Sequence, residues 1–336
     1  MTSTTTLRTT SSSPKLASTA TSITDGFIDL EDTDPNIPIG SNGKPQGSYF
    51  EHWPLERRIE KYNEFNRKFD LRIDPDLVEG FSHRLHWDEH PAVWLLRDAD
   101  LTLEDRIAIT IHWSFSNEKW TNLVTILEHG WDALDDLFAT ERHARSDLFQ
   151  VYYPKGTNVK QWLIDAPRQI AKDVAPIVAK YDRPLTMMEY AKIQEKVLKE
   201  KYGFRGPLYP CKNTARYLAM PCPNLVDPDS VLIGGTGHFR GMMYVFGPPN
   251  IDGKLKYSIG KMGEFLPENS YTEMWIDRMN ILMDHPGDPI HTHKFLNHED
   301  QLCWFSKFVE RKHGHKPPAR EFPRVWMFPD DFSLKV

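Results

Sequence analysis

The stretch Val231-Leu-Ile-Gly-Gly-Thr-Gly-His-Phe-Arg-Gly241 is the most informative part of this 336-residue chain. A hydrophobic start is followed by Gly235-x-Gly237, and a helical pattern then begins near His238 and continues through Val245. Glycines at this spacing allow a tight turn with positive φ and leave backbone amides pointing outward. The free N–H groups and the positive dipole end of the following helix then predict a site for one phosphate.

Such a turn between two helices has two interpretations. Helix-hairpin-helix proteins use it to hold the DNA backbone without reading bases. The alternative is a glycine-rich turn whose only role is to let two helices pack closely. Under the first interpretation the candidate phosphate-binding residues are Gly235, Thr236, Gly237, His238 and Arg240, the last through a charge-assisted contact.

The body around this motif is predicted to be all-α. Helical spacing of apolar residues dominates beyond Tyr49, and only residues 254–259 alternate as a short strand does. Because the chain has 25 prolines, we expect short helices with irregular connections. Helix starts are predicted at Pro54, Thr102, Asn117, Thr186 and Ser270, and helix ends at Gly130, Gly203 and Gly314.

The first 48 residues have a different composition from the body. Of the first 25 residues, 15 are Ser or Thr, and residues 25–48 are rich in Asp, Pro, Gly and Asn. A segment with so little apolar area does not offset its ordering entropy. We therefore expect a disordered tail and linker over 1–48 and one helical domain over 49–336.

Charge and cysteine content restrict the function classes. The 47 acidic and 41 basic residues give a net charge of −6, which excludes a strongly basic nucleic-acid binder but allows a local basic patch. No apolar run approaches the ~18 residues of a membrane-spanning helix. Three cysteines are too few for a disulfide framework and fit a reducing, intracellular compartment.

Three blocks of the chain together resemble one known family. They are Ile111-His-Trp-Ser-Phe-Ser-Asn-Glu-Lys-Trp-Thr-Asn-Leu123, the segment from Thr214 to Gly241 that includes Asp227-Pro-Asp, and Glu299-Asp-Gln-Leu-Cys-Trp-Phe-Ser-Lys-Phe308. In order and spacing they are similar to the alpha-glutamyl/putrescinyl thymine pyrophosphorylases, or amino acid:DNA transferases, which bacteriophages use to hypermodify thymine. The resemblance covers about residues 75–322. The chain departs from the family pattern at Glu118, Asp300 and Trp304.

The resemblance implies a DNA-glycosylase-like helix-hairpin-helix fold and a transfer reaction. An amino acid or polyamine displaces pyrophosphate from a pyrophosphorylated 5-hydroxymethyluracil in double-stranded DNA. This chemistry needs positive charge for the departing pyrophosphate, a proton acceptor for the amine and access to a flipped base. The implied partners are modified DNA and a small amine, and no cofactor is expected.

Candidate residues exist for each of these roles. Arg240 and Lys307, with Lys212 and Arg216, are candidates for the leaving group or DNA phosphates, although any one of them can equally be a solvated charge. The remaining candidates are Glu299 and Asp300 as general base or amine anchor, on what is otherwise an acidic helix surface, and Asn117 as a ligand contact or simply a helix N-cap.

Two further functions stay open at this stage. The departures at Asp300 and Trp304 favour a DNA-binding protein of the same fold without transferase activity. Four histidines within fourteen residues also allow a less favoured third hypothesis, a metal hydrolase, because His-x-His is capable of binding zinc. Loop polar groups are the more common role of such residues, so no metal site is predicted at His285, His291, His293 and His298.

Overall fold

The computed structural model describes residues 54–69, 91–116, 120–140, 158–204, 208–251, 253–256 and 270–312. These residues are mostly helical, as predicted. The predicted tail over 1–48 lies outside the described residues, and so does the predicted end at Gly314. The helices are α1 (Leu55–Phe69), α2 (Pro91–Asp98), α3 (Leu103–Phe115), α4 (Trp120–His129), α5 (Ala133–Thr140), α6 (Val159–Val178), α7 (Met187–Tyr202), α8 (Tyr209–Ala219), α9 (Thr236–Phe246), α10 (Ser270–Met283) and α11 (Lys294–Lys312).

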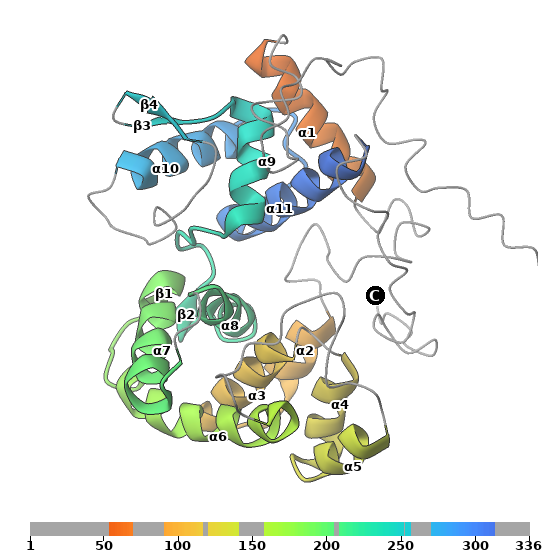
Figure 1. Ribbon diagram of the computed structural model, residues 1–336, viewed down its shortest axis with the longest axis vertical. Coiled ribbons are helices and arrows are strands. Elements are labelled where there is room, and N and C mark those ends of the chain that lie inside the picture. Colours follow the sequence, from red (N-terminus) through yellow and green to blue (C-terminus); the bar gives the residue numbers. More distant parts are fainter. Residues whose placement is uncertain are drawn as a thin grey trace, which may run out of the picture.

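The helices form two groups, each around its own hydrophobic cluster (Figure 1). Helices α2 to α8 make the first group. Helices α9, α10 and α11 make the second, and α1 joins them from the other end of the sequence by packing on α9 and α11. Leu296 of α11 nevertheless belongs to the first cluster, so this helix lies where the two groups meet. The prediction of one domain over 49–336 stays a prediction.

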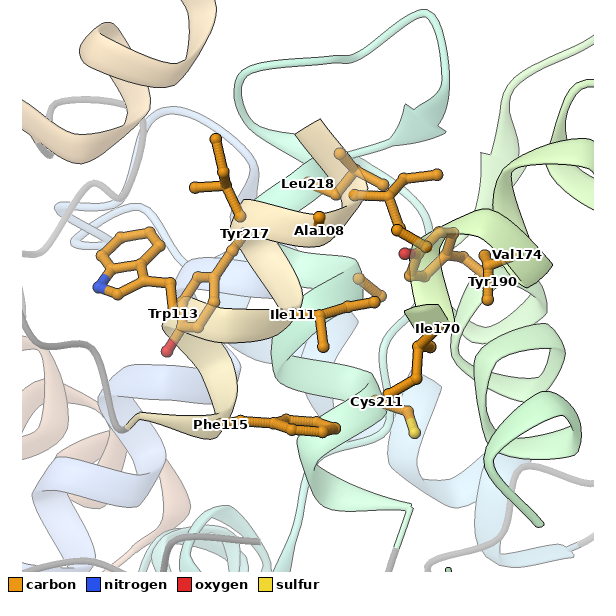
Figure 2. Packing of buried hydrophobic residues seen from close by; sticks show 14 of the residues in the cluster. Ala108, Ile111, Trp113, Phe115, Ile170, Val174, Tyr190, Cys211, Tyr217 and Leu218 are labelled. Carbon is orange, nitrogen blue, oxygen red and sulfur yellow. The ribbon is translucent and has the colours of Figure 1, made fainter. Parts of the chain in front are cut away.

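Helix α3 lies at the centre of the first group. Its residues Ile107–Phe115 are all buried, because α6 and α8 pack on it from two sides. Figure 2 shows Ile111 between Ile170 of α6 and residues of α8. Trp113 packs against Tyr217 with ring centroids 4.5 Å apart and the ring planes tilted by 38°. This packing fixes the orientation of α8, which carries two buried cations described below.

Several helix ends agree with the capping signals in the sequence. Thr102 caps α3 by accepting a hydrogen bond from the Asp105 amide, and α1 begins directly after Pro54. Gly130 and Gly203 have φ of +81° and +63°, a left-handed conformation that glycine adopts without strain, and they follow α4 and α7. The predicted cap at Asn117 lies outside the described residues.

The expectation that prolines keep the helices short is wrong for α6. This helix has 20 residues and contains Pro167 and Pro176. A proline removes one backbone hydrogen bond but does not always end a helix. The buried apolar positions of α6, Ile170 and Val174 among them, pack against α3 and keep the helix continuous.

Two pairs of very short strands complete the described part of the fold. Strand β3 (Asn250–Ile251) pairs antiparallel with β4 (Lys254–Leu255), which confirms the start of the strand predicted over 254–259. Strand β1 (Leu185–Thr186) pairs in parallel with β2 (Val226–Asp227), which the sequence did not predict. Among the described helices, none is long and apolar enough to cross a membrane.

The capping box at the start of α7 leads to a prediction about pH. The Thr186 hydroxyl accepts from the Glu189 amide, Glu189 accepts from the Thr186 amide, and Arg183 pairs with the same carboxylate at 2.7 Å. The hydrogen bond from Arg183, followed by those from Thr186, lowers the pKa of Glu189 from 4.5 to about 2. A lowered carboxyl pKa stabilises the fold above the unfolded pKa, and this contribution is lost as pH falls from 4.5 to about 2.

We therefore expect Glu189→Gln to lower the free energy of unfolding at pH 7 and to make no difference near pH 2. Urea unfolding of both proteins between pH 7 and the lowest pH at which the wild type still folds measures this convergence. A gap between the two proteins that stays constant over pH 5–2.5 would contradict the assignment.

Candidate functional site

A cluster of buried charged groups lies where α8, α9 and α11 meet. We call it the junction cluster, and each of its residues is at most 5% exposed. Burial of so many ionisable groups is rare unless they are paired. The members are Lys212 and Arg216 from α8, His238 from α9, and Glu299 and Asp300 from α11.

Arg216 holds both carboxylates of the cluster. One terminal nitrogen of its guanidinium forms an ion pair with Glu299, and the other donates to Asp300 Oδ1 at 3.2 Å. A planar guanidinium presents several donors in fixed directions, so it can hold two carboxylates at once. The predicted acidic pair is thus fixed by a residue from the first group of helices.

Lys212 lies one helical turn before Arg216 and on the same face of α8. Its ammonium group donates to the backbone carbonyl of Ile233, in the segment that leads into α9. Burial lowers the pKa of Lys212 to about 8, and the positive charge of Arg216 acts in the same direction. A lysine with such a pKa can lose its proton at mildly alkaline pH.

His238 is buried beside Glu299. Its ring stacks on Trp275 of α10 with centroids 4.9 Å apart, and its Nδ1 is 3.9 Å from Glu299 Oε1. Burial lowers the pKa of His238 to about 3, helped by the positive charges of Lys212 and Arg216. The imidazole is therefore neutral at physiological pH.

The glycines of the motif are needed for close approach. A Cβ on Gly234 would overlap the Glu299 carboxylate and the His238 ring, and one on Gly237 would overlap Cys303 Sγ. A Cβ on Gly241 would overlap the backbone carbonyl of Leu302. The closeness of α9 to α11 thus depends on these three positions.

The backbone of the motif differs from the sequence expectation in three respects. Helix α9 begins at Thr236, two residues before the predicted start. Its N-cap Gly235 has φ −91°, and the glycines of positive φ in the described residues all lie outside the motif. Residues 220–235 separate α8 from α9 and include β2, so the connection is longer than a tight hairpin.

The phosphate-binding candidates differ in exposure. Thr236 is exposed at the first turn of α9, and Gly235, Gly237 and Arg240 are half-buried. Gly235 caps the helix without a side-chain hydrogen bond. His238 is 1% exposed, so its side chain has no access to DNA in this conformation. Asn117 and the side chain of Lys307 lie outside the described residues.

The predicted histidine group is spread over separate partners. His285 contacts Glu56 and Asn63, at 2.9 and 3.1 Å, and His293 contacts Asp229 at 2.9 Å. His298 is buried between Tyr62 and Asp288, at 3.1 and 3.3 Å. Within the described ranges, no three His, Cys, Asp or Glu residues are grouped as metal ligands are.

The histidine contacts join α1 to the start of α11. Burial raises the pKa of Asp288, but hydrogen bonds from His298, Ile290 and Lys294 outweigh burial and leave its pKa below the ordinary value. Ionised Asp288 accepts from His298 Nε2, and His298 Nδ1 is hydrogen-bonded to the Tyr62 hydroxyl. These hydrogen bonds connect α1 to α11 and to the loop before it.

The sequence contains a signal for the buried position of Arg216. Lys212 and Arg216 are four residues apart, so they share one face of α8. The sequence makes both candidates for phosphate contacts, whereas the structure buries Arg216 against α11 and Lys212 against the segment before α9. Two cations on a face that otherwise carries Ala215 and Ala219 predict buried partners.

A cavity of about 290 Å³ lies elsewhere, on the outer side of α3 and α6. Arg168 lies above the Trp131 ring there, 5.5 Å from its centre, and Asp165 pairs with Arg168 at 3.3 Å. The residues that line this cavity include none of the junction cluster.

Comparison of the chain with protein-family models, curated proteins and solved structures finds no match in any of the three.

Proposed function

We propose that this chain transfers a small amine to a pyrophosphorylated 5-hydroxymethyluracil base in DNA. The observation that carries the proposal is the contact between Glu299, of the acidic pair of α11, and Gly234 of the glycine motif. Glu299 and Asp300 are more than eighty residues from Arg216 in sequence, yet both pair with it, and Glu299 also meets Gly234, 65 residues away. The resemblance described above requires this juxtaposition.

The cluster has the groups that the transfer needs. The amine nitrogen forms a bond to the exocyclic methylene carbon of the base, and the bond from this carbon to the pyrophosphate oxygen breaks. Pyrophosphate departs with the electron pair, and the amine loses a proton to a basic group of the cluster. Positive charge comes from Lys212 and Arg216 on α8 and from Arg240 on α9. This charge favours the departing pyrophosphate anion.

The start of α9 is the proposed DNA contact. Thr236 is exposed, and Gly235 leaves the first amides of the helix without a side-chain cap. Free amides and the helix dipole favour a phosphate at such a position. Contacts of this kind hold the sugar-phosphate backbone of DNA and carry no base specificity.

The transfer is tested with DNA that carries the pyrophosphorylated base. The protein is incubated with this DNA and glycine, glutamate or putrescine, and the nucleosides are then identified by mass spectrometry. We expect a new amino-substituted nucleoside and release of pyrophosphate. Arg240→Ala is expected to lower turnover by ~10²–10³-fold, the loss typical of one preorganised donor to a developing anion.

The matched control is Arg278→Ala. Arg278 is a half-buried arginine of the same group of helices, where it donates to the Gly247 carbonyl and lies over the Phe246 ring. Turnover of this folded variant should stay near that of the wild type. Equal turnover in Arg240→Ala and the wild type would exclude Arg240 from the site.

A second candidate function is DNA binding without transfer. The observation that favours it is the burial of Glu299 and Asp300, which are 3% and 5% exposed and already paired with Arg216. Under this second hypothesis the chain binds duplex DNA, and its affinity falls as the salt concentration rises, because counterions are released on binding. It would form no new nucleoside in the same assay.

A further inference from the structure

The two ring nitrogens of His238 are poorly satisfied within the junction cluster, because the ring interacts with the Gly235 backbone but not at ordinary hydrogen-bond geometry. Neither ring nitrogen has a hydrogen-bond partner of ordinary geometry among the described residues, although the ring is 1% exposed. A buried polar group without a partner destabilises the fold, and such groups in native proteins often have a catalytic or ligand-binding role. A phenyl ring would fill the same space on Trp275 without this cost.

The surroundings of His238 resemble those of an oriented imidazole base. Glu299 Oε1 is 3.9 Å from Nδ1, and the carboxylate is itself held by Arg216. The other charged groups near the ring are Lys212 and Arg216 of α8, while α10 contributes the uncharged Trp275. Hydrogen bonds of catalytic pairs are often long in the unliganded protein and shorten when substrate binds.

We infer that His238 is the proton acceptor of the transfer and that Glu299 orients it, an inference that rests on the proposed function. Nδ1–H donates to Glu299, which leaves the Nε2 lone pair free to take the proton from the attacking amine. As the C–N bond forms and the C–O bond to pyrophosphate breaks, the imidazole becomes an imidazolium ion. Glu299 stabilises this cation, which then returns its proton to water.

The other neighbours have supporting roles in this arrangement. Arg216 positions Glu299, and Gly234 leaves room for the carboxylate and the imidazole side by side. Because both groups are buried, the amine and the base reach Nε2 only when the helices at the junction move apart. This movement would take the imidazole from an environment that keeps it neutral to one in which it can accept a proton.

The first experiment separates a catalytic role from a structural one. His238→Phe keeps the stacking on Trp275 and removes both nitrogens, so we expect an unchanged or higher Tm. Transfer in the assay above is expected to fall by ~10²-fold or more, the usual contribution of a general base. Full transfer in this variant would overturn the inference.

The second experiment does not depend on transfer. Nitrogen-15 NMR of histidine-labelled full-length protein reports which ring nitrogen carries the proton. We expect the Nδ1–H form in the wild type, because Glu299 faces Nδ1, and a shift toward Nε2–H in Glu299→Gln. An identical tautomer in both proteins would overturn the pairing of His238 with Glu299, whether or not His238→Phe folds.

The two readouts also distinguish this inference from the proposed function. A wild-type protein that gives no product with any of the three amines contradicts the transfer itself. If the tautomer nevertheless responds to Glu299→Gln, the oriented pair is present and its substrate is a different one. Product formation with a tautomer that does not respond retains the transferase and removes Glu299 as the group that orients His238.

Discussion

Replacement of Arg216 by methionine is expected to lower the free energy of unfolding by ~3–5 kcal/mol, the usual cost of removing one partner of a buried ion pair. The cost is high because Glu299 and Asp300 stay buried after their shared cation is gone. Methionine has a similar length and high helix propensity, so α8 itself is little affected. Urea unfolding at neutral pH measures the loss.

Two controls test this explanation. Lys199→Met removes the cation of an ion pair with Glu195 on α7, where Lys199 is 51% exposed, and should cost no more than ~1 kcal/mol. Adding Glu299→Gln and Asp300→Asn to Arg216→Met should restore part of the loss, because no charge is then left unpaired. A loss in Arg216→Met no larger than in Lys199→Met would show that the buried pairing is absent.

The sequence predicted the local elements well because their signals are local. The capping box at Thr186 and the C-terminal glycines Gly130 and Gly203 act within one helical turn, and the structure confirms them. Helix α6 was missed because Pro167 and Pro176 disfavour a helix locally. Packing against α3 decides its conformation, and that contact is visible only in three dimensions.

The candidate site was predictable in part. The resemblance placed Glu299 and Asp300 near the glycine motif, and the structure brings Glu299 to Gly234 and His238. The position of Arg216 between the two carboxylates was not predicted, because a cation on a helix gives no sign of which distant segment it pairs with. The same holds for the two hydrophobic clusters, since α1 packs with helices more than 160 residues away in sequence.

Long-range contacts also explain why three of the glycines in the motif are needed. Positive φ is a local property, and the spacing of Gly235 and Gly237 predicts it at these two residues. The structure instead has Gly234, Gly237 and Gly241 facing α11, where the absence of a side chain sets how near two helices approach. The packing interpretation therefore accounts for these three glycines, and the phosphate interpretation is confined to the exposed start of α9.

Gly241→Ala is therefore expected to destabilise the protein by ~3 kcal/mol, at the upper end of the usual cost of overpacking. The added Cβ would lie 2.6 Å from the Leu302 carbonyl carbon and 3.0 Å from its Cα, and backbone atoms inside a helix do not move aside as a side-chain end does. This cost exceeds the ~1 kcal/mol that alanine gains over glycine in a helix.

Gly235→Ala is the matched control, because its Cβ meets only Tyr209 Cδ2 at an ordinary 3.4 Å and should cost no more than ~1 kcal/mol. Urea unfolding compares the two variants with the wild type. If Gly241→Ala were as stable as Gly235→Ala, α9 and α11 would not be in contact through Gly241. If the contact is present, Gly241→Ala also moves Glu299 away from His238, so transfer should fall even in the folded fraction.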